Sequence, residues 1–93
     1  MNNEKIKDVL LAFVEKYHIK RMVLFGSRAD GTNTDNSDVD LIVEFTVPVS
    51  LITLSQVQLD MEEALGLKVD IVHGPIREGD MIEISREVVL YAA

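Results

Sequence analysis

Two stretches of the chain space their hydrophobic residues as an amphipathic helix does, with one apolar face. Asn2 or Asn3 is placed to cap the first helix, and Ser50 to cap the second, which Gly66 would end as its C′ residue. The apolar face of the first helix comprises Ile6, Val9, Leu10, Phe13, Val14 and Tyr17, and that of the second Leu54, Val57, Met61, Ala64 and Leu65.

Short apolar runs bounded by polar or turn residues predict three strands. They are Met22–Phe25, Leu41–Phe45 and Lys68–Val72. Pro48 marks the end of the second strand. Residues 28–37 are rich in Asp, Asn, Thr and Gly, which predicts a loop with room for a helical turn after Ser27.

The end of the chain predicts less regular structure. His73–Pro75 is typical of a turn, and a last helix is expected from about Asp80 to Arg86. A short apolar tail, Val88–Tyr91, follows it. Because helices alternate with strands, we expect an α/β fold, a layered arrangement of helices around a small sheet. The 93 residues, 47% of them hydrophobic, are enough for one domain, residues 1–93.

Composition narrows the chemistry. The chain has no cysteine, which excludes disulfides and thiolate metal sites, and His18 and His73 match no metal-ligand spacing. Its net charge of −7 argues against direct nucleic-acid binding and suits metal ions or a basic protein partner. No apolar signal segment opens the chain and no apolar run is long enough to cross a membrane, so we expect a cytoplasmic protein.

Asp38 and Asp40 lie two residues apart where a strand is predicted to begin. Strand side chains alternate between faces, so both carboxylates should share one face with their Cα atoms roughly 6–7 Å apart. Two such carboxylates can hold a pair of divalent cations about 3.5–4 Å apart, and oxygen ligands favour Mg²⁺. Taken alone, the pair also fits a solvated turn that leads into a strand.

Gly26 and Ser27 follow a predicted strand and precede the polar loop. A glycine there permits close backbone approach, and the next amides and the serine hydroxyl could bind a phosphate, although the same pair is common in ordinary turns. Asp70 interrupts an otherwise apolar strand, which suits either a solvent-facing edge residue or a metal ligand. Three carboxylates at one site would be stable only with cations between them.

Taken together, Gly26-Ser27, ten residues, Asp38-x-Asp40 and Asp70 on a later strand resemble the nucleotidyltransferase pattern of the DNA polymerase β superfamily. The likeness is greatest to the minimal nucleotidyltransferase (MNT) family, with its signature Gly-Ser-x10-Asp-x-Asp. The resemblance implies a small mixed sheet with helices packed mainly on one face, similar to the polymerase β palm. It extends over most of the chain and includes Ser37–Leu41 and Glu87–Tyr91.

The resemblance also implies residue roles. Gly26, Ser27, Arg28 and Ser37 would bind ATP, the substrate. Two Mg²⁺ ions would be held by Asp38, Asp40 and Asp70, and Asp70 would help to deprotonate the attacking hydroxyl. Asp30 stands where many relatives have arginine, so it places a negative charge in the phosphate-binding loop.

Proteins resembling this one pair with HEPN proteins in toxin–antitoxin modules. By that resemblance, the chain would transfer AMP to a tyrosine of a cognate HEPN ribonuclease toxin, with which it would form a hetero-oligomer, as a type VII-like antitoxin. Since the sequence ends after the catalytic core, we expect the core or a partner to recognise the acceptor. The alternatives are a non-catalytic antitoxin that neutralises the toxin by binding, or nucleotide transfer to a small-molecule acceptor.

Overall fold

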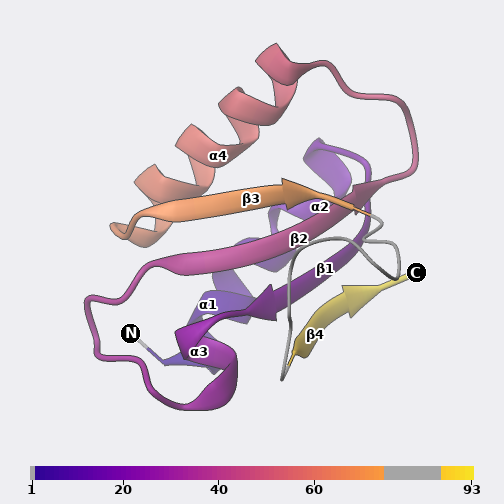
Figure 1. Ribbon diagram of the computed structural model, residues 1–93. Coiled ribbons are helices and arrows are strands. Elements are labelled where there is room, and N and C mark those ends of the chain that lie inside the picture. Colours follow the sequence, from indigo (N-terminus) through magenta and orange to yellow (C-terminus); the bar gives the residue numbers. More distant parts are fainter. Residues whose placement is uncertain (1, 75–86) are drawn as a thin grey trace.

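The computed structural model describes residues 2–74 and 87–93 (Figure 1). The predicted helix Asp80–Arg86 therefore lies outside the described residues. In chain order the elements are α1 (Asn3–Leu11), α2 (Phe13–Lys16), β1 (Ile19–Phe25), α3 (Ser27–Asp30), β2 (Val39–Phe45), α4 (Leu51–Leu65), β3 (Val69–His73) and β4 (Val88–Ala92).

The strands form one mixed sheet in the order β3-β2-β1-β4. β1 pairs antiparallel with both β2 and β4, whereas β2 and β3 are parallel. A parallel pair needs a crossover connection, and α4 supplies it. Ser50 caps α4 by accepting a hydrogen bond from the Thr53 amide at 3.1 Å, and Gly66 ends it in the left-handed conformation. The predicted α/β fold with a small mixed sheet is confirmed.

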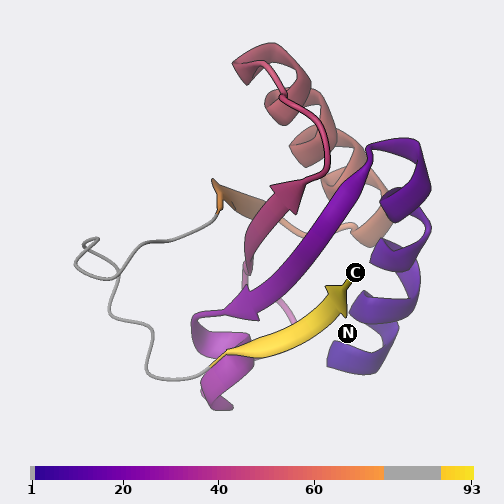
Figure 2. The same ribbon diagram turned by 90° about the vertical axis from the view of Figure 1, so that its right-hand side faces the viewer.

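Helices α1, α2 and α4 cover one face of the sheet, as Figure 2 shows. Side chains alternate between faces along a strand, so every second residue of the central strands enters the core between sheet and helices. The predicted packing of helices mainly on one face is therefore confirmed. The core is made of Ile6, Leu10, Ile19, Met22, Leu24, Val39, Leu41, Val43, Val57, Met61, Leu65, Val69 and Leu90. The described helices are all too short or too polar to span a bilayer.

The first predicted helix is in fact two. A turn at Ala12 separates α1 from α2, yet the apolar face continues: Leu10 is fully buried, and Phe13 and Tyr17 pack half-buried against the core. The prediction of one helix was wrong. The break at Ala12 leaves the apolar side chains on both sides of it facing the core, so their spacing still matches that of one helix.

The apolar segment Val88–Tyr91, predicted as a tail, is a strand. It belongs to β4, which pairs with β1 through Arg21 opposite Ala92 and Leu24 opposite Val88. Leu90 is 4% exposed and joins the core. β1 is also longer than predicted, since it begins at Ile19.

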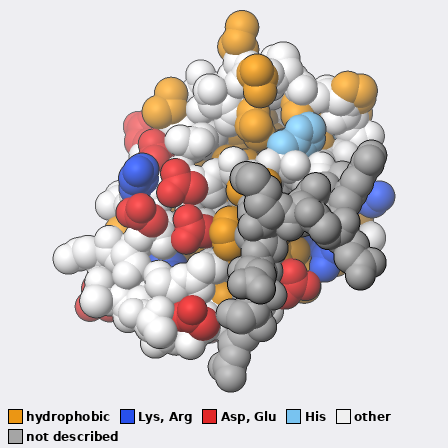
Figure 3. Space-filling model, viewed as in Figure 1, with side chains coloured by type: hydrophobic (Ala, Val, Ile, Leu, Met, Phe, Trp, Pro, Cys, Tyr) orange, Lys and Arg blue, Asp and Glu red, His pale blue; other side chains and the backbone are white. Residues whose placement is uncertain are grey.

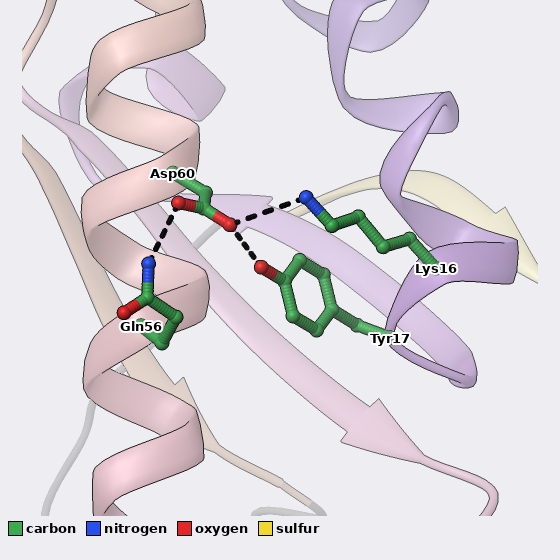
Figure 4. A network of polar contacts seen from close by, with 4 residues as sticks. All are labelled: Lys16, Tyr17, Gln56 and Asp60. Carbon is green, nitrogen blue, oxygen red and sulfur yellow. Dashed lines mark hydrogen bonds and ion pairs between the residues drawn. The ribbon is translucent and has the colours of Figure 1, made fainter.

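A polar network fastens α2 to α4 (Figure 4). The carboxylate of Asp60 in α4 accepts hydrogen bonds from the Tyr17 hydroxyl and from Gln56 Nε2, the latter at 2.8 Å, and Lys16 Nζ lies 3.5 Å away. The hydrogen bond from Tyr17, more than that from Gln56, lowers the pKa of Asp60. The network therefore holds the carboxylate ionised between the two helices.

Candidate active site

The structure places Asp40 and Asp70 side by side. In the parallel pairing of β2 and β3 they are direct partners, so their backbones lie about 4.8 Å apart. Their neighbours Val39 and Val69 are fully buried on the helix side, so both aspartates face away from the helices. Acidic side chains gather over this part of the sheet in Figure 3. Asp38 precedes β2 by one residue and is exposed.

The electrostatics of Asp40 reflect this crowding. Burial raises the pKa of its carboxyl group, and the charges of Asp70 and Asp38 raise it further, while Lys68 opposes the shift. The half-buried carboxylate is therefore destabilised when ionised, and a cation placed beside it would relieve the repulsion.

The close approach of the chain to Asp40 requires glycine at position 26. Its φ of 73° and ψ of −153° lie in a region that side chains with a Cβ rarely adopt. A Cβ atom on Gly26 would lie 2.3 Å from Asp40 Oδ2, closer than any real contact. The glycine therefore lets the turn after β1 pass directly against the acidic cluster.

Ser27 begins the helical turn α3, as the sequence allowed. The amides of Ala29 and Asp30 donate to the Gly26 carbonyl at 3.0 and 3.2 Å. The first amides of a helical turn, which begins here at Ser27, point out of the turn at its N-terminal end. They are placed next to the carboxylate cluster because Gly26 touches Asp40.

The remaining predicted nucleotide ligands are engaged in the loop between α3 and β2. Arg28 is buried, and its guanidinium donates to backbone carbonyls of that loop. The hydroxyl of Ser37 accepts a hydrogen bond from the Thr34 amide at 2.8 Å. Their contact with ATP stays a prediction, whereas their contacts in the loop are observed.

Asp30 is also held within the loop. Its Oδ1 accepts hydrogen bonds from the Thr32 amide at 3.0 Å and from the Thr32 hydroxyl at 2.6 Å. These hydrogen bonds hold the Asp30 carboxylate against the backbone and stabilise the turn that follows α3.

Asp38, Asp40 and Asp70 offer only carboxylate oxygens, which are the type of ligand that a hard divalent cation prefers. As they stand, no three acidic or histidine side chains in the described residues converge on one ion position. Asp40 and Asp70 are fixed on neighbouring strands, and Asp38 is exposed and can change rotamer at little cost. A bound ion would thus require side chains of this cluster to change rotamer.

Lys68 is a site residue that sequence reasoning missed. It lies directly before β3, its carbonyl accepts from the Val39 amide at 2.8 Å, and its charge acts on Asp40. The available signal was its position two residues before Asp70, since alternating residues share one face of a strand.

This strand order, with paired aspartates beside a glycine–serine turn, defines the nucleotidyltransferase class of mixed α/β folds. The chain belongs to the nucleotidyltransferase domain family, whose model matches residues 6–89. The resemblance inferred from its motifs is confirmed. Protein adenylyltransferase MntA of Thermococcus cleftensis is 32% identical over 91 residues, 92% of each chain. An adenylyltransferase inferred for Methanocaldococcus jannaschii is 36% identical over 72 residues, 77% of each chain.

Solved structures show the same fold. One assigned as a minimal nucleotidyltransferase is 32% identical, covers 78% of each chain and has a TM-score of 0.65. A toxin–antitoxin structure with AMP-PNP reaches a TM-score of 0.78 at 20% identity, over 94% of this chain and 73% of that one. A tri-AMPylated HEPN toxin of Shewanella oneidensis with its MNT antitoxin reaches 0.72 at 15% identity, over 97% and 72%. The last two establish the fold alone.

Proposed function

We propose that this chain is an Mg²⁺-dependent nucleotidyltransferase that transfers AMP from ATP to a tyrosine hydroxyl of a HEPN ribonuclease toxin, as a type VII-like antitoxin. The observation that carries the proposal is the placement of Asp40 beside Asp70 and against Gly26. Two further findings support it: relatives are named protein adenylyltransferases, and one structural neighbour contains a tri-AMPylated HEPN toxin.

The place of each residue supports the role that we propose for it. Asp38, Asp40 and Asp70 would hold the cations, because the charges of Asp38 and Asp70 act on the Asp40 carboxyl group and raise its pKa. Mg²⁺, when bound, supplies positive charge that neutralises the phosphates and lowers the pKa of an oxygen attached to it. Gly26 leaves room for the phosphates, and the amides that begin at Ser27 can donate to them.

The reaction balances within this site. The acceptor oxygen forms a bond to the α-phosphorus of ATP while the bond to the oxygen bridging the α- and β-phosphates breaks. The electron pair of that bond leaves with pyrophosphate, and the hydroxyl proton passes to Asp70. Positioning and charge neutralisation supply most of the rate enhancement in such a transfer.

The test is to incubate the protein with ATP, Mg²⁺ and the product of the neighbouring gene and to measure the intact mass of that product. We expect a gain of one or more AMP units with the wild type and none with Asp38→Asn. No mass gain with the wild type under any metal condition would refute the transfer to this partner.

A second candidate, neutralisation of the toxin by binding alone, is favoured by a different surface. No charged residue occurs from Phe45 to Leu59 in a chain with a net charge of −7. Leu51 and Ile52 of this stretch, in the first turn of α4, are 82% and 84% exposed. Exposed apolar residues without neighbouring charges are typical of the centre of a protein interface, here one that would receive an apolar face of the toxin.

Cell survival separates the two candidates. If transfer protects the cell, Asp38→Asn and Asp70→Asn lose protection although they still bind the toxin. If binding suffices, both variants protect as the wild type does, and Ile52→Asp abolishes protection by placing a charge in the interface.

A further inference from the structure

Arg28 is the buried charged side chain of the described residues, with 2% of its surface exposed. It extends from α3 into the loop that leads to β2. Its Nε donates to the Ser37 carbonyl at 3.2 Å, and its Nη2 donates to the carbonyls of Ser37 at 2.9 Å, Asp35 at 3.1 Å and Thr34 at 3.5 Å. The guanidinium thus binds three backbone carbonyls of one short stretch, residues 34–37.

A buried guanidinium is stable only where its donors are satisfied, and carbonyls that converge on it are fixed in return. The loop closes on itself at the same place, because the Ser37 amide donates to the Thr34 carbonyl at 3.2 Å. Ser37 immediately precedes Asp38. The contacts of Arg28 therefore set the direction in which the chain enters the acidic cluster.

The backbone of Arg28 makes a second connection. Its carbonyl accepts a hydrogen bond from Asn3 Nδ2 at 2.8 Å, which ties the start of α1 to α3. α3 begins at Ser27, directly after the turn that touches Asp40. Arg28 therefore follows the glycine–serine turn directly in the chain, is tied to α1 through its carbonyl, and is hydrogen-bonded through its side chain to the loop before β2.

We infer that Arg28 is a positioning residue, which sets Asp38 relative to Gly26 and Asp40 and does not bind the nucleotide itself. The inference rests on the proposed nucleotidyl transfer for its effect on rate. Its structural part, the order of residues 31–38, stands independently of that reaction. It replaces the expectation from sequence that Arg28 contacts ATP.

The test compares Arg28→Lys with Arg21→Lys. Lysine keeps the charge and loses the planar fork, so it cannot hold several carbonyls in fixed directions. Arg21 is the matched control, since its side chain is 43% exposed and lies 3.9 Å from each of its carboxylate partners, Glu44 and Glu87. Both variants undergo the same chemical change, one inside the loop and one on the surface of the sheet.

Amide hydrogen exchange of the metal-free protein is the first readout. We expect Arg28→Lys to speed exchange in residues 31–38 by about tenfold or more, because hydrogen bonds to a charged group are lost there, while β1 and α4 exchange as in the wild type. Arg21→Lys should leave residues 31–38 unchanged. Wild-type exchange of this loop in Arg28→Lys would overturn the inference.

Binding of AMP-PNP is the second readout. For a positioning residue, affinity in EDTA stays within about twofold of the wild type, while the Mg²⁺ concentration needed for full binding rises by about tenfold as the backbone at Asp38 loses its fixed position. A fall of affinity in EDTA as large as that in Mg²⁺ would show that Arg28 binds the phosphates directly, and would overturn the inference. Both readouts remain decisive if no acceptor is ever modified, so failure of the proposed function is distinguishable.

If Arg28→Lys does not fold, Ser37→Ala tests the same loop without touching the guanidinium. It removes the hydroxyl that accepts from the Thr34 amide. We expect faster exchange in residues 31–38 and a smaller rise in the Mg²⁺ requirement. A loop as ordered as in the wild type, with unchanged Mg²⁺ dependence, would contradict the inference.

Discussion

Gly26→Ala tests the contact that joins the turn after β1 to the acidic cluster. The new Cβ atom would lie 2.3 Å from Asp40 Oδ2, and real Cβ contacts essentially never fall below 3.0 Å. The carboxylate or the turn must therefore shift, so that the two atoms separate by at least the difference, 0.7 Å. The variant disturbs the position of Asp40 while every carboxylate remains in the chain.

Two costs follow from the geometry. The backbone of Gly26, at φ 73° and ψ −153°, lies in a region where alanine costs about 1–3 kcal/mol of stability. A displacement of this size at Asp40, a proposed metal ligand, should reduce kcat by about 10²-fold, as misplacement of about 1 Å does elsewhere. The loss of activity should therefore exceed any loss of folded protein.

The chain offers a matched control in Gly66→Ala. Gly66 also has positive φ, 68°, but a Cβ there would meet nothing within 4 Å, and the residue lies at the end of α4. Alanine at Gly66 should cost about 1–2 kcal/mol, or roughly 4–8 °C in Tm for each kcal/mol, and leave kcat unchanged. The assays are thermal unfolding and pyrophosphate release at a temperature where both variants are fully folded.

Equal kcat for the two alanine variants would refute the reasoning, because it would mean that the position of the Asp40 carboxylate does not matter to the reaction. A loss of activity confined to Gly26→Ala, with both proteins folded, is the predicted result.

Three other variants test the electrostatics and the core. Asp40→Asn should raise Tm at pH 7 in EDTA, because the raised pKa of Asp40 means that its ionised form destabilises the fold. This gain in Tm should vanish near pH 3, below the ordinary aspartate pKa of 3.8, where the carboxyl group is protonated in the folded and the unfolded chain. A lower Tm at pH 7 would contradict this. Asp60→Asn should lower the free energy of unfolding above about pH 4, because the hydrogen bond from Tyr17 lowers the pKa of Asp60 and stabilises its ionised form. This contribution is lost as the pH falls through the lowered pKa, so the variant should cost nothing well below that value. Urea unfolding at pH 7 and pH 2 measures the difference, and equal losses at both would disprove it. Met61→Ala should lower the free energy of unfolding in urea by about 2–5 kcal/mol, because Met61 is fully buried. Ile52→Ala should change it by less than about 0.5 kcal/mol, because Ile52 is 84% exposed. Similar losses for the two variants would contradict the burial pattern.

Local patterns predicted most of the elements correctly. Helix caps at Asn2 and Ser50 and a stop at Gly66 were readable because caps depend on a few adjacent residues. The strand at Val88–Tyr91 was missed because its reason lies far away in sequence: β1 supplies the hydrogen bonds, and no pattern in a short apolar segment distinguishes a paired edge strand from a tail.

The site was predictable in part. The alternation of strand side chains predicted that Asp38 and Asp40 share one face, and the position of Asp70 was left open. That Asp40 and Asp70 are direct partners depends on the register of β2 and β3, which one sequence does not determine. The interaction of Gly26 with Asp40 and the burial of Arg28 likewise depend on how the turn and the loop fold over the sheet.

The central claim is that the chain transfers the α-phosphoryl group of ATP as AMP. The most direct test supplies the toxin partner and Mg²⁺ with ATP radiolabelled on either the α- or the γ-phosphate, and follows the label in the toxin. We predict that label enters from the α-position alone, and that Asp40→Asn abolishes its entry. Label entering from the γ-position, or from neither, would contradict the account.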